Sequence, residues 1–312
     1  MDTLTQMILG ASVGAVVMGK SHGRKAALVG AICGTLPDLD VFIPYDNAVE
    51  KFTYHRGFSH SILFCILMTP VLAWLFSTVK WFGIAFKNLR VHLAIFLALL
   101  THALLDAMTI YGTQLFWPLQ TPPVGLGSIF IVDPLYSIPF LLCLLWYLIF
   151  KNYKIAVAGL MISTAYLAWS ATMQYHVTQI ARPQIEGQLL AQPTPLNTIL
   201  WRVIVVQEGQ YQVGYYSLFD DDQVIEFQPY TSIPSLLDQT SWSTKRLKWF
   251  TKGFYAVRVE SGDIVLSDLR MGLEPDQYVF QFVMNDEPAT KFETPRDMSR
   301  LNDIWDRMVR DL

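Results

Sequence analysis

The sequence VHLAIFLALLTHALLDAMTIY, at residues 91–111, decides the fold of the N-terminal half. Its length matches the roughly 20 apolar residues that a helix needs to span a bilayer, yet it carries His102 and Asp106 near one end. Ionisable side chains at membrane depth are costly and often mark function. Because His102 and Asp106 are four residues apart, they lie on one face of a helix. The segment therefore predicts a membrane helix with a polar site near its end.

Further apolar segments flank this one along the chain. Residues 61–79 and 155–175 are also long enough to span a bilayer, and residues 134–150 are slightly short but carry no charge. Residues 4–19 and 26–36 are shorter and rich in glycine and alanine, which lets helix backbones approach closely in lipid. We therefore predict four spanning helices, preceded by a close-packed hairpin of two short helices.

The composition agrees with an α-helical membrane domain at residues 1–175 followed by a soluble domain. Of the 312 residues, 52% are hydrophobic and only 16% are charged, whereas a soluble domain carries about a quarter charged residues. The net charge of −3 and the lack of a basic run argue against a nucleic-acid partner. Cys33, Cys65 and Cys143 lie in apolar segments without metal-ligand spacing, so we interpret them as core residues.

The sequence changes character after residue 175. Residues 176–197 are polar and contain three prolines, which predicts a linker. Beyond them, segments rich in Val, Ile, Tyr and Phe alternate with glycine-containing turns, which indicates an antiparallel sheet. These segments are residues 200–207, 211–218, 224–228, 248–259, 264–268 and 278–283. Residues 294–312 then place apolar side chains at spacings of three and four, so we predict that the α+β domain at residues 198–312 ends in an amphipathic helix.

The basic residues between the apolar segments predict an orientation, because short cytoplasmic loops carry an excess of Lys and Arg. Alternate connections contain Lys20, Arg24, Lys25, Lys80, Lys87, Arg90, Lys151 and Lys154. The opposite connections contain only Lys51 and Arg56. This bias predicts a multi-pass protein whose N-terminus and C-terminal domain lie on the outer face.

Two more polar clusters are predicted at the membrane depth of His102 and Asp106. Asp38 and Asp40 follow the second short apolar stretch, and the sequence HRGFSH at residues 55–60 precedes the next helix on the same side. Imidazole and carboxylate groups are the ligands that Zn²⁺ and related divalent metals take. A metal held here could activate water for attack on an ester or phosphoester. The spacing alone leaves open which side chains coordinate.

A simpler interpretation exists for each of these residues taken singly. An intramembrane His or Asp can be a hydrogen bonder that joins two helices. Asp133 directly precedes Pro134, which is typical of a helix cap. The convergence of three separate clusters is what favours a metal site.

At these positions the sequence resembles the YdjM/YbcI-type family of inner-membrane proteins, described as metal-dependent hydrolases. The resemblance rests on MDTLT at residues 1–5, PDLD at 37–40, HRGFSH at 55–60 and HALLD at 102–106, and extends to LWRV at 200–203. It implies a location in the bacterial inner membrane and a hydrolase activity. Members of this family often carry His where this chain has Gln6.

Together, the residues and the resemblance predict a membrane-bound metal-dependent hydrolase with a divalent metal, zinc being the first choice. The expected ligands are His55, His60, His102, Asp106 and Asp38. Asp40 and Arg56 are the expected catalytic residues: Asp40 could also ligate or orient a ligand, and Arg56 would bind an anionic group. Membrane lipid is the expected partner, and an amphiphilic ester or phosphoester the expected substrate. The alternative is a non-enzymatic membrane scaffold or an ion-binding transporter that uses the same polar cluster.

Overall fold

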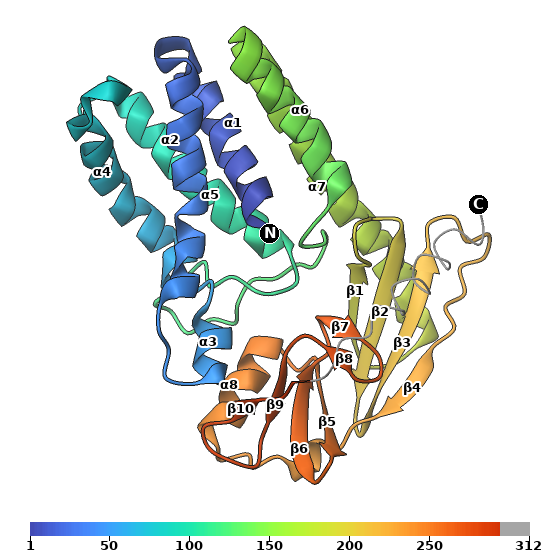
Figure 1. Ribbon diagram of the computed structural model, residues 1–312. Helices are drawn as coiled ribbons and strands as arrows, with labels where there is room; N and C mark the ends of the chain where they lie inside the picture. Colours follow the sequence, from blue (N-terminus) through green and yellow to red (C-terminus); the bar gives the residue numbers. More distant parts are fainter. Residues whose placement is uncertain (294–312) are drawn as a thin grey trace. The chain divides into compact units, whose positions relative to one another are not determined.

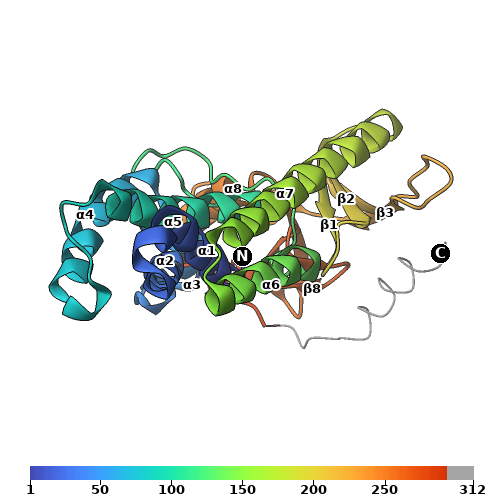
Figure 2. The same ribbon diagram turned by 90° about the horizontal axis from the view of Figure 1, so that it is seen from above.

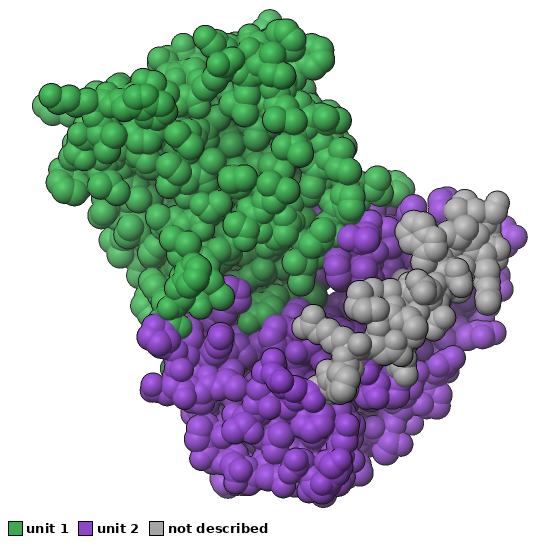
Figure 3. All heavy atoms as spheres, viewed as in Figure 1, with its two compact units in different colours: residues 1–43, 56–126, 131–169 green, residues 44–55, 127–130, 170–312 purple. Residues whose placement is uncertain are grey.

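A computed structural model describes residues 1–293 (Figure 1). A helical N-terminal region is followed by an antiparallel sheet domain, which confirms the predicted fold class. The predicted amphipathic helix at residues 294–312 lies outside the described residues. The chain divides into two compact units (Figure 3). Unit 1 comprises Met1–Ile43, Arg56–Leu126 and Ile131–Trp169, and the described part of unit 2 comprises Pro44–His55, Gly127–Phe130 and residues 170–293.

Unit 1 is a bundle of helices in which α1, α2 and α5 lie side by side (Figures 1 and 2). Its helices are α1 (Thr3–His22), α2 (Arg24–Thr35), α4 (Ile62–Thr78), α5 (Leu89–Met108), α6 (Pro134–Phe150) and the first part of α7 (Tyr153–Ala181). A Cβ on Gly10 would lie 2.3 Å from the carbonyl oxygen of Gly30, and one on Gly14 would lie 2.2 Å from that of Ala26. The glycines therefore let α1 and α2 pack backbone to backbone, as the close-packed hairpin required.

Fewer helices meet the length for membrane crossing than the four that the sequence predicts. Among the described residues, α5 and the segment Tyr153–Gln184 are long and apolar enough, and a third candidate arises only if α4 is counted together with the bent segment Ala48–His60. α4 and α6 each have 17 residues, somewhat short of the roughly 20 that a perpendicular span needs. α6 coincides with the predicted stretch 134–150, and α4 is shorter than its predicted stretch by one residue at each end.

Unit 2 contains two four-stranded antiparallel sheets and a two-stranded ribbon. The first sheet has the order β1 (Gln188–Pro193), β2 (Leu200–Gln207), β3 (Gln210–Ser217), β4 (Gln228–Thr231). The second has the order β10 (Thr290–Lys291), β9 (Gln281–Val283), β6 (Asp263–Asp268), β5 (Tyr255–Glu260). The ribbon joins β7 (Gly272–Leu273) to β8 (Gln277–Tyr278), and helices α3 (Ala48–Tyr54) and α8 (Trp242–Thr251) complete the unit.

Three predictions in this part of the chain are wrong. The predicted linker at residues 176–197 contains the end of α7 and strand β1, because its prolines fall at the ends of these elements rather than inside a flexible segment. The predicted strand at 224–228 is a loop, and pairing with β3 begins only at Gln228. The predicted strand at 248–259 starts at Tyr255, because Ser241 caps helix α8 and the helix buries Leu247 and Phe250 instead.

Strand β2 is buried on both faces and forms the centre of unit 2. Trp201, Val203 and Val205 pack with Val177 and Ile180 of α7. Ile204 points to the other face, into a second apolar cluster that includes Leu269 and Tyr278. The continuous apolar character of β2 follows from this position between two cores.

Candidate metal centre

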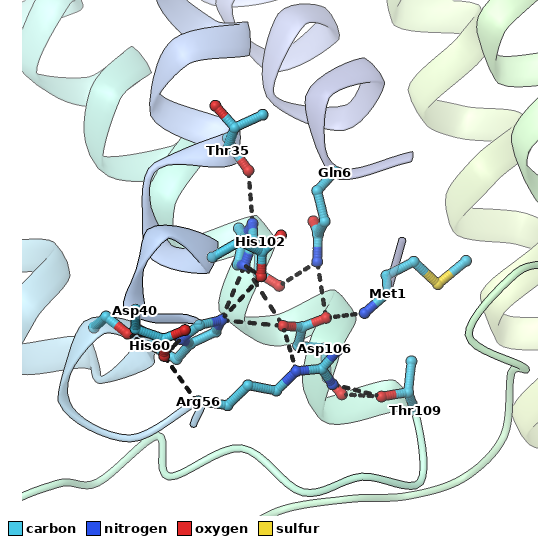
Figure 4. A network of polar contacts seen from close by, with 12 residues as sticks. Met1, Gln6, Thr35, Asp40, Arg56, His60, His102, Asp106 and Thr109 are labelled. Atoms are coloured by element: carbon cyan, nitrogen blue, oxygen red, sulfur yellow. Dashed lines mark hydrogen bonds and ion pairs between the residues drawn. The ribbon is translucent and has the colours of Figure 1, made fainter. Parts of the chain in front are cut away.

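The structure brings together four of the predicted site residues in unit 1 (Figure 4). They are Asp38 on the 3₁₀ helix η1 (Pro37–Phe42), His60 at the end of the 3₁₀ helix η2 (Phe58–His60), and His102 and Asp106 on α5. One ligand atom from each lies within 4.8 Å of the other three. Three separate stretches of sequence therefore converge on one point.

The distances between these ligand atoms fit a tetrahedral divalent metal. Nε2 of His60 lies 3.1 Å from Nε2 of His102, 3.2 Å from Oδ2 of Asp106 and 3.6 Å from Oδ1 of Asp38. Nε2 of His102 lies 3.4 Å from Oδ1 of Asp38 and 3.5 Å from Oδ2 of Asp106. Four ligands about 2.0–2.1 Å from a tetrahedral zinc ion are separated by roughly 3.3–3.4 Å. The residues present therefore fit such an ion.

The hydrogen bonds on the outer side of both imidazoles determine which ring nitrogen faces the cluster with a lone pair. Nδ1 of His102 lies 2.6 Å from the carbonyl oxygen of Gly34, which can only accept, so Nδ1 is the donor. The hydroxyl of Ser59 donates to Oδ2 of Asp40 at 2.9 Å and lies 2.9 Å from Nδ1 of His60, so it accepts from that nitrogen. In the neutral rings both Nε2 atoms are therefore acceptors that point at each other.

Burial and the surplus of acceptor atoms favour a bound metal ion at this cluster. Two imidazole lone pairs and two carboxylate oxygens converge, and Oδ2 of Asp106 accepts no hydrogen bond. The side chains of His60, His102 and Asp106 have no exposed surface, whereas that of Asp38 is 17% exposed. Asp106 has two positive neighbours, the amino group of Met1 and the Arg56 guanidinium, and a divalent metal would add charge at the point where all four ligand atoms meet. Asp38 marks the open side of the cluster.

Asp40 lies behind His60 rather than among the four ligands. Its Oδ2 accepts from the Ser59 hydroxyl and, at 2.9 Å, from the backbone N–H of Arg56, and it lies 3.5 Å from Nδ1 of His60. A carboxylate in this position fixes the ring orientation and tautomer of a metal-binding histidine. Of the roles considered for Asp40, the geometry favours orientation of a ligand.

Arg56 places a positive group beside the cluster. Its side chain is nearly buried, with Nε 3.2 Å from Oδ2 of Asp106 and Nη1 donating to the Thr109 hydroxyl at 3.0 Å. The guanidinium lies 5.1 Å from the centre of the Tyr111 ring. Arg56 can therefore contact an anionic group bound beside Asp106.

Two further contacts support Asp106, one from Gln6, the position that the family resemblance singled out, and one from Met1. Nε2 of the fully buried Gln6 donates to Oδ1 of Asp106 at 3.0 Å and to the carbonyl oxygen of His102 at 3.2 Å. Oδ1 of Asp106 also pairs with the amino group of Met1. Gln6 thus binds Oδ1 of Asp106, while Oδ2 of the same carboxylate faces the other ligand atoms. Nothing in an N-terminal methionine signals such a role, since it depends on the backbone amine.

The remaining predicted ligand, His55, is placed elsewhere, and Asp133 has the role of a helix cap. His55 follows α3 as its C-terminal cap in unit 2 and is not one of the four grouped residues. Asp133 caps α6: it accepts from the backbone N–H of Tyr136 at 3.1 Å and from the Tyr166 hydroxyl at 2.8 Å. The capping interpretation of Asp133 is therefore confirmed.

Fold and cluster together define a helical membrane protein with a buried His/Asp site. Residues 1–177 match the YdjM inner membrane protein family, and the chain belongs to that family, as the sequence resemblance indicated. The chain is 26% identical over 231 residues to the uncharacterized protein YfhP of Bacillus subtilis (strain 168), covering 69% of this chain and 68% of that protein. It is 33% identical over 94 residues to the inner membrane protein YbcI of Escherichia coli (strain K12), covering 30% of this chain and 52% of that one. No solved structure matches.

Proposed function

We propose that this chain is a membrane-bound, metal-dependent hydrolase acting on an ester or phosphoester. The observation that carries the proposal is the set of four acceptor atoms, 3.1–3.6 Å apart along five of their edges, with the Arg56 guanidinium beside them. A divalent metal held there, zinc being the first choice, would supply a Lewis acid that activates water. The chain itself supplies the ligands, their orientation and an anion-binding group.

Asp38 has a special place in this proposal. Catalytic zinc sites commonly use three protein ligands and keep a fourth position open. His60, His102 and Asp106 are fully buried and form the inner three, while Asp38 is the partly exposed one. We therefore infer that substrate approaches the cluster from the side of Asp38, and that Arg56 binds a negatively charged group of that substrate.

The proposal includes the position of the protein in the bacterial inner membrane. The uneven distribution of basic residues supports several crossings, with the sheet domain on the outer face. A site next to membrane helices suits an amphiphilic substrate, so membrane lipid is the proposed partner.

A metal-stabilised scaffold is the second candidate function. Structural zinc sites are closed by four protein ligands, and this cluster offers four, three of them without exposed surface. In a scaffold the metal would join α5 to η1 and η2 and perform no chemistry.

The test has two stages, and both use detergent-purified full-length protein. Metal analysis compares wild type with His60→Ala and His102→Ala, and with the control His92→Ala, which removes a histidine near the other end of α5. A stoichiometric metal in wild type and control, lost in the other two, supports the site; equal content in all four contradicts it. A panel of lipid and phosphoester substrates is then assayed. Metal-dependent turnover supports the hydrolase, and retained metal with no turnover across the panel supports the scaffold.

A further inference from the structure

One loop of the chain leaves the metal centre, enters unit 2 and returns to the metal centre. Unit 1 includes the chain up to Ile43 and again from Arg56, whereas the intervening Pro44–His55, here called the α3 loop, belongs to unit 2. The residues just before this loop include Asp40, and the residue just after it is Arg56. Both ends of the loop are therefore parts of the site.

The base of the α3 loop is closed by hydrogen bonds. The backbone N–H of Arg56 donates to Oδ2 of Asp40 at 2.9 Å, and the N–H of Ile43 donates to the Asp40 carbonyl at 3.0 Å. The same Asp40 oxygen accepts from Ser59, whose hydroxyl contacts His60. Three hydrogen bonds therefore connect the backbone of Arg56, through Asp40 and Ser59, to His60.

Arg56 also has a backbone conformation that needs outside support. Its φ is 58°, in the left-handed region, which a non-glycine residue adopts only when its surroundings over-determine it. Two hydrogen bonds support this conformation. The N–H of Arg56 donates to Asp40, and the carbonyl oxygen of Arg56 accepts from the N–H of Gln114 at 3.0 Å. On the other side, Arg56 is joined to α3 through His55 alone.

Unit 2 holds α3 by an aromatic contact. The ring of Phe52, only 4% exposed, lies 4.7 Å from the ring of Phe250 on α8, 4.3 Å from that of Phe280 and 5.4 Å from that of Phe282. Aromatic pairs at such distances contribute beyond the apolar area that they bury. Phe52 is therefore the anchor of the α3 loop.

Arg246 on α8 contacts the next two residues of α3, Thr53 and Tyr54. Its Nε donates to the hydroxyl of Thr53 at 2.9 Å, and Nη2 donates to the Thr53 carbonyl at 3.3 Å. Its guanidinium also lies 4.6 Å from the centre of the Tyr54 ring. The last turn of α3 is thereby fixed two residues before Arg56.

We propose that Phe52 and Arg246 are positioning residues of the His/Asp cluster: their contacts hold α3, and the chain runs from α3 through His55 directly into Arg56, whose N–H donates to Asp40. The inference rests on the proposed metal site for its functional meaning. Releasing α3 would return conformational freedom to the loop, and the left-handed conformation of Arg56 would lose one of its supports.

The experiment measures Zn²⁺ affinity by chelator competition and the visible spectrum of the Co²⁺-loaded protein. The variants are Phe52→Ala, the conservative Phe52→Leu, and Arg246→Ala. Tyr216→Ala is the matched control, because Tyr216 is also 4% exposed but packs in the separate cluster around Trp201. Loss of an outer-shell support typically costs about 10–100-fold in metal affinity. We expect about tenfold weaker Zn²⁺ binding and a changed Co²⁺ spectrum in Phe52→Ala and Arg246→Ala, with recovery in Phe52→Leu and no change in Tyr216→Ala.

Hydrogen exchange at residues 56–60 provides a readout that does not depend on metal. Faster exchange there in Phe52→Ala and Arg246→Ala, but not in Tyr216→Ala, supports the positioning role even if wild type binds no Zn²⁺, a result that would contradict the proposed function alone. Wild-type exchange in both variants overturns the inference, as does wild-type Zn²⁺ affinity with an unchanged spectrum. If Phe52→Ala does not fold, Arg246→Ala decides, since it removes polar contacts rather than a core ring.

Discussion

Each unit of this protein buries a cluster of ionisable side chains, and the two clusters differ in how donors match acceptors. In unit 1, four acceptor atoms converge from His60, His102, Asp38 and Asp106. In unit 2, Arg202 and Glu274 form a buried ion pair, with Nε of Arg202 donating to Oε1 of Glu274 at 2.7 Å. A cluster with more acceptors than donors favours a bound cation, whereas a matched pair satisfies itself.

The pair in unit 2 is completed by neighbours on both sides. Nη1 of Arg202 donates to the carbonyl oxygen of Leu269 at 2.9 Å, and the hydroxyl of Tyr215 donates to Oε2 of Glu274 at 3.1 Å. Burial raises the pKa of Tyr215 well above its ordinary value, so this hydroxyl keeps its proton and remains a donor. The comparison teaches that burial of charge alone does not indicate a functional site; the surplus of acceptors does.

The largest expected effect comes from a substitution that breaks the buried Arg202–Glu274 ion pair of unit 2. Glu274→Gln leaves the Arg202 guanidinium buried without a counter-charge, which should lower the free energy of unfolding of unit 2 by about 3–5 kcal/mol. Chemical denaturation followed by tryptophan fluorescence measures this loss. Metal content should stay at the wild-type level, because Glu274 belongs to the other cluster.

The double variant Arg202→Met/Glu274→Leu serves as the control for that prediction. Replacement of a whole buried ion pair by apolar side chains is often neutral or stabilising, so most of the lost stability should return. If the double variant were as unstable as Glu274→Gln, the two side chains would stabilise unit 2 by more than the compensation of each other's charge.

The next largest effect is expected when one ligand is removed from the His/Asp cluster of unit 1. Zinc bound to structural sites contributes about 10–16 kcal/mol, so one of four ligands accounts for roughly 2.5–4 kcal/mol. Asp106→Asn should therefore weaken Zn²⁺ binding by two to three powers of ten, measured by chelator competition. Asp133→Asn is the control, because that carboxylate caps α6. Equal affinity of both variants for Zn²⁺ would show that Asp106 is not a ligand.

A smaller effect is expected from Asp40, which touches the cluster only through His60 and its neighbours. Asp40→Asn keeps the size of the side chain and one oxygen that can accept from both Ser59 and the N–H of Arg56, but it removes the negative charge beside His60. Zn²⁺ affinity should fall by about 10–100-fold, less than for Asp106→Asn. A loss as large as that of Asp106→Asn would make Asp40 a ligand itself.

Local periodicity explains why so much of the cluster could be predicted. His102 and Asp106 share a face because they are one helical turn apart, and the other two ligands lie in short polar motifs next to apolar stretches. The aromatic partners of Phe52 lie about two hundred residues later in the chain, and no local pattern links them. Tertiary packing likewise decides that Leu247 and Phe250 belong to a helix, since their apolar neighbours are equally compatible with a strand.

The smallest expected effect concerns Gln6, where family members often carry histidine. Gln6 donates one hydrogen bond to Oδ1 of Asp106, the oxygen that points away from the other ligands. Because a histidine can donate to the same oxygen, Gln6→His should change Zn²⁺ affinity by less than about tenfold, at the lower limit for outer-shell residues. Gln6→Leu removes the donor at similar size and should weaken binding more. A gain of several powers of ten in Gln6→His would instead mean that position 6 coordinates the metal directly, and that this chain has an incomplete ligand set.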